Sequence, residues 1–178
     1  MRTRHMQWLG GAALVVGLVA CSSLKVQTDA DPQANLTAYK RFAFARVEGA
    51  QAAPQLDQLM AKRVEDAIVT ELTKKGLQYD SAGTSADVYV VYHAGKEDKV
   101  EVYNNAGYSY GRWGGAYYGG GTSVSQYTEG SLTIDLYDGQ RKEMVWRGTA
   151  SDTVNDRNDA ARKIPVVIAK MFERFPKA

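Results

Sequence analysis

The chain has 178 residues, of which 44% are hydrophobic and 24% charged, a composition typical of a globular protein. It has 22 lysine and arginine residues against 20 aspartate and glutamate residues. Arg2 and Arg4 lie in an N-terminal segment that we expect to be removed, so the remainder is balanced at 20 against 20, with dispersed basic residues. Such a domain lacks the positive surface that nucleic-acid binding requires, and we exclude nucleic acid as a partner.

The first twenty residues have the pattern of an export signal. Arg2 and Arg4 are followed by an apolar run from Trp8 to Ala20. That run holds about 13 residues, whereas a membrane-spanning helix needs roughly 20. A positive start, a short apolar stretch and a small-residue cleavage site are typical of a removable signal peptide. We therefore expect residues 1–20 to be cleaved off.

The residues Leu18, Val19, Ala20 and Cys21 resemble the lipobox of bacterial lipoproteins. The resemblance implies cleavage after Ala20, a diacylglycerol group on the Cys21 thiol and an acyl group on the new amino terminus. Two or three acyl chains anchor a protein durably, whereas one binds only marginally. An ordinary secretory signal is the alternative, but the only cysteine of the chain stands at this position. By the same resemblance, Ser22 favours sorting to the periplasmic face of the outer membrane over retention in the inner membrane.

Residues 21–23 form a very short tether, and residues 24–178 suffice for one domain. Because Cys21 carries lipid, the mature chain has no thiol for a disulfide, a nucleophile or a metal site, and we expect no cofactor besides that lipid. At about 3.5 Å per extended residue, the tether reaches on the order of 10 Å. We therefore expect the domain to lie close to the membrane surface.

Two segments show the three- and four-residue spacing of apolar residues that is typical of an amphipathic helix. The first begins near Pro54, carries apolar residues from Leu56 to Leu72, and ends at Gly76, which can provide a left-handed cap. The second runs from Asp159 to Phe175, and Pro165 within it predicts a kink or a restart.

About five segments have the composition or alternation of strands. The run from Asp87 to His93 is apolar at nearly every position, which predicts cover on both faces. Asp138 and Gly139 predict a hairpin turn, with a longer loop through Lys142 as the alternative. The strand segments are Leu24 to Thr28, Arg41 to Ala45, Asp87 to His93 (continued by Lys99 to Tyr103, unless that stretch forms a short neighbour), Ser131 to Leu136, and Met144 to Thr149.

These elements predict an α+β fold, in which two helices pack on one face of a mixed or antiparallel sheet of about five strands. Trp146 alternates with Val145 and Arg147 on the return strand, and we expect it in the core beside Leu132 to Leu136.

Several of these segments also resemble a known family of bacterial envelope lipoproteins, the one described as domain of unknown function 4136. The resemblance covers most of the mature chain and implies the fold, but it implies no catalytic residue. The matching segments are Tyr39 to Phe44, Ala86 to Tyr92, Leu132 to Asp138 with Met144 to Gly148, and Phe172 to Pro176.

Few residues have side chains suited to catalysis or metal binding. The mature chain has a single histidine, His93, which we interpret as a hydrogen-bonded structural residue, because zinc sites need three or four ligands and catalytic histidines need a nucleophile beside them. Pairs of carboxylates can hydrolyse glycosidic bonds, so acidic clusters are the basis of an enzyme alternative. The clusters comprise Glu97, Asp98 and Glu101, and Asp152, Asp156 and Asp159.

Residues 107–121 are the most unusual stretch, with seven glycines, five aromatic residues and one charge. Glycine raises the entropic cost of ordering, so one interpretation is a mobile insertion between strands. Tyrosine and tryptophan combine an apolar body with a polar tip, so the other interpretation is a contact segment for sugars, proteins or lipid. Its candidate contact residues are Tyr108, Tyr110, Arg112, Trp113, Tyr117 and Tyr118.

The sequence thus predicts a membrane-anchored, non-enzymatic domain that binds or scaffolds an envelope protein or peptidoglycan. A glycan-acting enzyme that uses the acidic clusters is the alternative.

Overall fold

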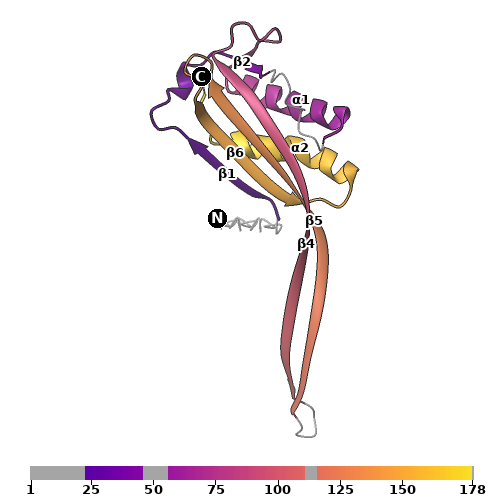
Figure 1. The fold of residues 1–178 in the computed structure, drawn as a ribbon. Coiled ribbons are helices and arrows are strands. Elements are labelled where there is room, and N and C mark those ends of the chain that lie inside the picture. The colour runs from indigo at the N-terminus through magenta and orange to yellow at the C-terminus, as the bar shows by residue number, and fades with distance from the viewer. Residues whose placement is uncertain (1–22, 46–55, 111–115, 178) are drawn as a thin grey trace, which may run out of the picture.

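The computed structural model describes residues 23–45, 56–110 and 116–177. A six-stranded sheet carries two helices on one face (Figure 1). The strand order is β1-β6-β5-β4-β2-β3; β2 runs parallel to β3 and β4, and the other pairs are antiparallel. The elements are β1 (Lys25–Ala30), the short 3-10 helix η1 (Leu36–Ala38), β2 (Arg41–Phe44), α1 (Gln58–Lys74), β3 (Gln78–Tyr79), β4 (Val88–Tyr110), β5 (Ala116–Asp138), β6 (Met144–Thr153) and α2 (Arg157–Phe172).

The predicted α+β class is confirmed, with both helices on one face of a mixed sheet. The sixth strand, β3, has only two residues, too few to show an alternating pattern in the sequence. None of the helices in the described ranges is long and apolar enough to cross a membrane.

Helix α1 begins later than the sequence predicted. Its N-cap is Asp57, whose carboxylate accepts hydrogen bonds from the N–H groups of Leu59 and Met60, while Pro54 lies outside the described residues. Capping by an aspartate satisfies N–H groups that have no partner within the helix. At the other end, Gly76 has a φ of 102°, as expected for the left-handed residue that follows a helix.

Helix α2 is continuous through Pro165, so the predicted restart is wrong. Its N-cap is Asp156, whose side chain accepts from the Asp159 N–H, and it ends at Phe172 rather than at Phe175. Pro165 is exposed, so the side of the helix that lacks an N–H donor faces solvent.

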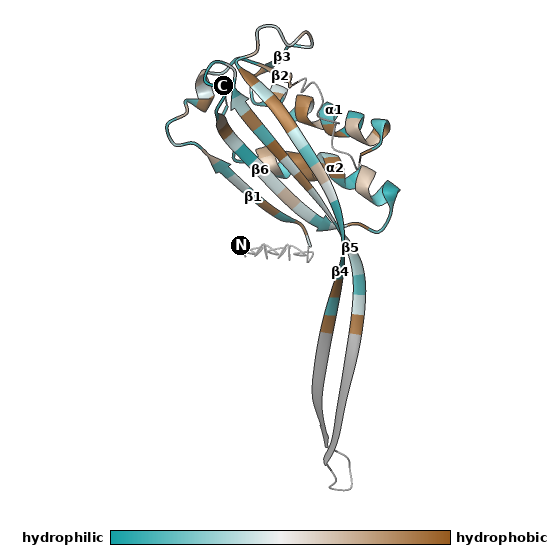
Figure 2. Cartoon of the chain, in the orientation of Figure 1, coloured by the Kyte–Doolittle hydropathy of each residue, from teal (hydrophilic) through white to brown (hydrophobic). Residues whose placement is uncertain are grey.

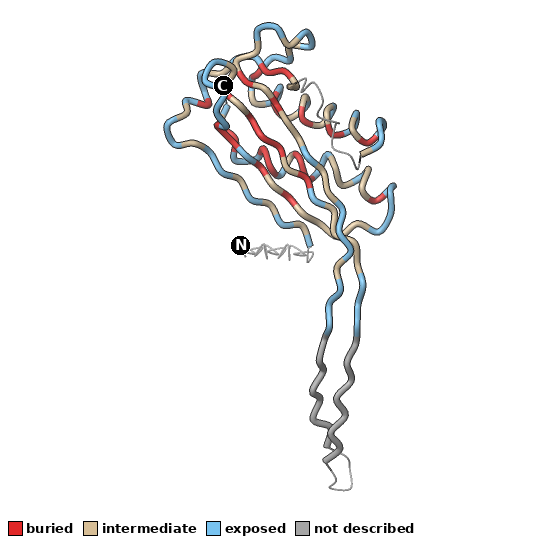
Figure 3. Tube along the Cα trace, viewed as in Figure 1, coloured by how far each residue is buried: buried red, intermediate tan, exposed pale blue. Residues whose placement is uncertain are grey.

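The core lies between the helices and the sheet, where the buried residues concentrate (Figure 3). Trp146 is only 4% exposed and pairs with Leu136, which confirms its predicted place. Its indole stacks on Phe172 at 4.8 Å and meets Phe175 edge-on at 5.6 Å. Gly148 leaves room for this ring, since a Cβ added there would lie 2.5 Å from the indole.

The opposite face of the sheet is open, which corrects one expectation. Val88 and Val90 are buried under the helices, but Tyr89 and Val91 are half-buried and His93 is exposed. The prediction of cover on both faces is therefore wrong. His93 is exposed on this open face, and its interpretation as a hydrogen-bonded structural residue stays a prediction. A run of aromatic and β-branched residues also suits a strand with one open face.

The turn after β5 takes the longer of its two predicted forms. β5 ends at Asp138 and β6 begins at Met144, and Lys142 between them has a φ of 59°. The Gly139 N–H donates to the backbone oxygen of Asp87 at 2.7 Å, which fastens this turn to the start of β4.

Candidate functional site

Strands β4 and β5 leave the body of the sheet as a two-stranded ribbon, which we call the hairpin (Figure 1). They stay in register from Val88 opposite Asp138 to Tyr110 opposite Ala116. Pairing of β5 with β6 ends at Glu129, so from Asp98 outward no other described strand borders either edge. At about 3.3 Å per residue, the projecting part is about 45 Å long.

The hairpin corrects the interpretation of residues 107–121 as a loop. Residues 107–110 belong to β4 and residues 116–121 to β5, and Tyr108 lies opposite Tyr118. Glycine weakens the interior of a strand but does not prevent its backbone from pairing, so glycine content alone misled the prediction. Tyr110 and Tyr117 are also strand residues, whereas Arg112 and Trp113 lie outside the described residues. The contact role of these side chains stays a prediction.

Close to the body, the two faces of the hairpin differ in chemistry. One face carries three exposed valines, Val100, Val102 and Val124, with exposed fractions of 57%, 57% and 60%. We call this the valine face; Figure 2 colours the apolar positions of the described part of the hairpin brown. We did not predict this face, although the alternation of valine with Glu101 and Ser125 indicates it in the sequence.

The other face, the charged face, holds a network around Lys99. Its ammonium group lies 2.8 Å from Glu97 and 3.8 Å from Glu129, and the Tyr127 hydroxyl donates to Glu101 at 3.3 Å. The hydrogen bond to Glu97 is the main reason why the pKa of Lys99 is raised. Three carboxylates against one ammonium group make this face acidic.

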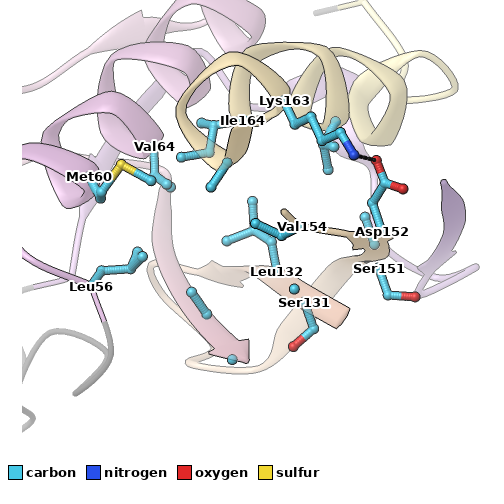
Figure 4. A pocket seen from close by; sticks show the side chains of 16 residues that line it. Leu56, Met60, Val64, Ser131, Leu132, Ser151, Asp152, Val154, Lys163 and Ile164 are labelled. Carbon is cyan, nitrogen blue, oxygen red and sulfur yellow. Dashed lines mark ion pairs between the residues drawn. The ribbon is translucent and has the colours of Figure 1, made fainter. Parts of the chain in front are cut away.

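A small cavity opens where the hairpin leaves the body, between the helices and the sheet (Figure 4). Its volume is about 120 Å³, somewhat less than an engineered cavity of about 150 Å³ that binds benzene. It can therefore accept one small apolar group. The residues around it include Leu56, Met60, Val64, Leu132, Val154 and Ile164, with Ser131, Ser151, Asp152 and Lys163 as polar members.

Lys163 links two of the acidic residues at this cavity. Its ammonium group lies 3.1 Å from Asp152 and 3.4 Å from Asp159, and it donates to the backbone oxygen of Thr153 at 2.5 Å. Partial burial alone would lower the pKa of Lys163, but the two carboxylates raise it overall. The backbone N–H of Asn155 is the largest cause of the lowered pKa of Asp159, followed by Lys163 itself.

The acidic residues do not form one cluster. Asp152 and Asp159 meet at Lys163, whereas Asp156 caps α2. On the hairpin, Asp98 accepts from the Thr128 hydroxyl at 2.7 Å, on the opposite face from Glu97 and Glu101. Within the ranges that the structure describes, no group of three or more His, Cys, Asp or Glu side chains could hold a metal ion.

The N-terminal end of the described chain lies at the base of the hairpin. The Ser23 hydroxyl donates to the carboxylate of Asp152, a residue that borders the cavity, and Lys25 pairs with Ser151. Ala20 and Cys21 lie outside the described residues. The sequence offered no signal for this proximity, because it depends on the pairing of the first strand with the last.

Comparison with solved structures shows the same fold in other proteins. A DUF4136 family protein from Bacteroides thetaiotaomicron has 15% identity and a TM-score of 0.53 over 85% of this chain and 95% of its own. A PelC variant from Paraburkholderia phytofirmans, described as a dodecamer, has 15% identity and a TM-score of 0.51 over 84% of this chain and 94% of its own. A PDZ domain protein from Parabacteroides distasonis has 15% identity and a TM-score of 0.56 over 88% of this chain. This chain covers 36% of that protein's length.

At this level of identity, the likenesses show the fold alone. The comparison with curated proteins finds no match. The family model described as a domain of unknown function, DUF4136, matches residues 26–177, a range that contains both helices, all the strands after the first residue of β1, and the whole hairpin. The chain therefore belongs to the DUF4136 family.

Proposed function

We propose that this chain is a lipid-anchored protein of the cell envelope whose domain binds or scaffolds another envelope component through the hairpin. The observation that carries the proposal is the hairpin itself, which projects about 45 Å from the body with no neighbouring strand on either described edge. Isolated two-stranded ribbons are marginally stable in water, and free strand edges readily pair with other chains. A partner would supply contacts that the body does not.

The proposed anchor is the diacylglycerol and N-acyl lipid on Cys21, and the proposed location is the periplasmic face of the outer membrane. The lipobox residues and Ser22 support both. The position of Ser23 at the surface of the folded body is consistent with a tether of only a few residues.

Binding or scaffolding accounts for the acidic residues better than catalysis does. Asp152 and Asp159 share Lys163, and Asp156 caps a helix, so these carboxylates already have structural partners. The PelC neighbour is a dodecamer, which supports a role for this fold in assembly. Peptidoglycan or another envelope protein is the proposed partner.

The anchor is tested by mass spectrometry of the membrane fraction, where we expect a chain that starts at Cys21 and carries acyl mass. Cys21→Ser should give an unprocessed or soluble chain. Recovery of an unmodified mature chain from wild-type membranes would contradict the anchor.

The contact role is tested by replacing residues 107–121 with a short Gly-Ser turn and crosslinking in intact envelopes. We expect the shortened chain to lose co-purification with peptidoglycan or envelope proteins. Lys62→Ala, in an exposed pair on α1, is the control and should keep every contact. A folded, shortened chain that also keeps every contact would refute the role of the hairpin.

The non-enzymatic part of the proposal is tested on the acidic residues. Asn or Gln replacements of Glu97, Asp98, Glu101 and Asp156, made one at a time, should leave the phenotype of the strain unchanged. One such variant that folds normally and abolishes function would favour the glycan-acting enzyme.

A further inference from the structure

We infer that the valine face, Val100, Val102 and Val124, lies against the lipid surface of the membrane that holds the N-terminal anchor. This inference rests on the proposed lipid anchor at Cys21. It goes further in assigning a second membrane contact, made by a defined face of the hairpin.

The described chain begins close to the base of the hairpin. The Ser23 hydroxyl is bonded to Asp152, and Lys25 pairs with Ser151, close to the point where the hairpin leaves the body. Only Ser22 separates Ser23 from Cys21. At about 3.5 Å per residue, a lipid-embedded Cys21 brings the base of the hairpin within about 10 Å of the bilayer.

The hairpin is much longer than the tether. It projects from the end of the body at which the described chain begins (Figure 1). Its length, at about 3.3 Å per residue, is about 45 Å. The tether is several times shorter than the hairpin. The body therefore cannot move far enough from the bilayer for the hairpin to point toward the membrane without meeting it. The hairpin therefore runs along the lipid surface, with one face toward it.

The chemistry of the two faces decides which of them lies against the lipid. The valine face exposes more than half of each valine, and burial of such side chains in the lipid boundary is favourable. Asp98 lies on the same face at its body end, where its carboxylate accepts a hydrogen bond from the Thr128 hydroxyl. The charged face carries Glu97, Glu101 and Glu129 against Lys99, and ions of this kind are costly to remove from water. Anionic lipids would also repel this acidic face. Contact through the valine face leaves the Lys99 network in solvent.

Adjacent residues of β5 provide a matched test, because Val124 lies on the valine face and Ser125 pairs with Glu101 on the charged face. In the lipidated chain the sulfur of Cys21 is a thioether, so Val124→Cys or Ser125→Cys introduces the only free thiol. Each full-length variant is labelled with an environment-sensitive fluorophore and reconstituted into phosphatidylethanolamine–phosphatidylglycerol vesicles. Val102→Cys and Glu101→Cys form a second pair if either first variant misfolds.

We expect a blue shift and quenching by brominated lipid for the label at Val124, and neither effect at Ser125. If the protein floats with the vesicles but both labels stay in water, the valine face does not touch lipid, although the anchor stands. Failure to float with vesicles would overturn the anchor itself. A shift at Val124 that grows with protein concentration without vesicles, in a Cys21→Ser chain, would assign the face to a second copy and overturn the inference.

Discussion

The hydroxyl of Tyr39 donates a 2.7 Å hydrogen bond to the carboxylate of Asp138, which joins the segment before β2 to the turn after β5. The same carboxylate accepts from the N–H groups of Gln140 and Arg141, each at 2.8 Å. These hydrogen bonds lower the pKa of Asp138 to about 2, and the bond from the Arg141 N–H has the largest effect. The pKa of Tyr39 is raised, mainly by burial and next by its hydrogen bond to the Asp138 carboxylate.

This relationship predicts how stability depends on pH. Because the pKa of Asp138 in the folded chain lies below its value of about 3.9 in an unfolded chain, the carboxylate stabilises the fold above pH 4. That contribution, on the order of 2 kcal/mol, is lost as the pH falls from about 4 to 2. Asp138→Asn should therefore lower the free energy of unfolding at pH 7 and flatten its decline below pH 4. Urea unfolding at several pH values measures both effects, with Glu143→Gln in the same turn as the control.

A second prediction concerns the ion pair on the open face of the sheet. Arg147 holds Asp135 with two hydrogen bonds, of 2.6 and 2.8 Å, and Asp135 is only 1% exposed. Arg147→Met leaves a buried carboxylate without its cation, which should cost about 3 kcal/mol of unfolding free energy. The double variant with Asp135→Asn should recover a large part of that loss. Equal stability of the single and double variants would show that solvent already compensates Asp135.

Trp146→Ala should be one of the most destabilising substitutions in the chain. The indole is buried, and stacks on Phe172 and meets Phe175. Truncation of a buried tryptophan costs about 3 to 5 kcal/mol. Trp146→Phe should cost less, because it retains an aromatic ring in this cluster. A melting temperature of Trp146→Ala within a degree of wild type would contradict the packing around β6.

Gly148→Ala should destabilise the fold through the same ring. The added methyl would lie 2.5 Å from the indole of Trp146, which Phe172 confines on its stacked side. Forced overpacking of this kind costs about 1 to 3 kcal/mol. The cost should shrink when Gly148→Ala is made together with Trp146→Phe, and a double-mutant cycle measured by urea unfolding tests this coupling.

Shortening the hairpin should leave the body intact. The described residues of the segment 107–121 pair only within the two strands of the hairpin, and the described core lies entirely in the body. Closure entropy changes slowly with loop length, at about 0.6 kcal/mol for each doubling, so the Gly-Ser replacement should melt within a few degrees of wild type. A large drop in melting temperature would mean that the distal hairpin stabilises the body.

The fold was predictable wherever the signal is local. The spacing of Val64, Ile68 and Leu72 identified α1, and Trp146 was placed in the core from alternation alone. The order of the strands was not predictable, because β1 pairs with β6 through contacts between residues far apart in the sequence. The open face was missed because the apolar run around Tyr89 is also compatible with a covered strand.

The candidate site was predictable only in part. The unusual composition of residues 107–121 drew attention to the correct region, but its glycines suggested a loop where the structure has paired strands. The alternation of Val102 with Glu101 and of Val124 with Ser125 indicates strands with one apolar face, but only the register places the two valines opposite each other. The cavity and the contact of Ser23 with Asp152 require the tertiary fold.

The pairing of β1 with β6 also bears on the order in which the chain folds. Ser23 and Asp152 are 129 residues apart, whereas the distal hairpin pairs Tyr110 with Ala116. Local contacts form before distant ones, since they require less loop closure. The hairpin can therefore assemble early in folding, while β1 has no partner until nearly the whole chain is available. The first strand made is thus the last to be placed, and it stays open to mispairing until then.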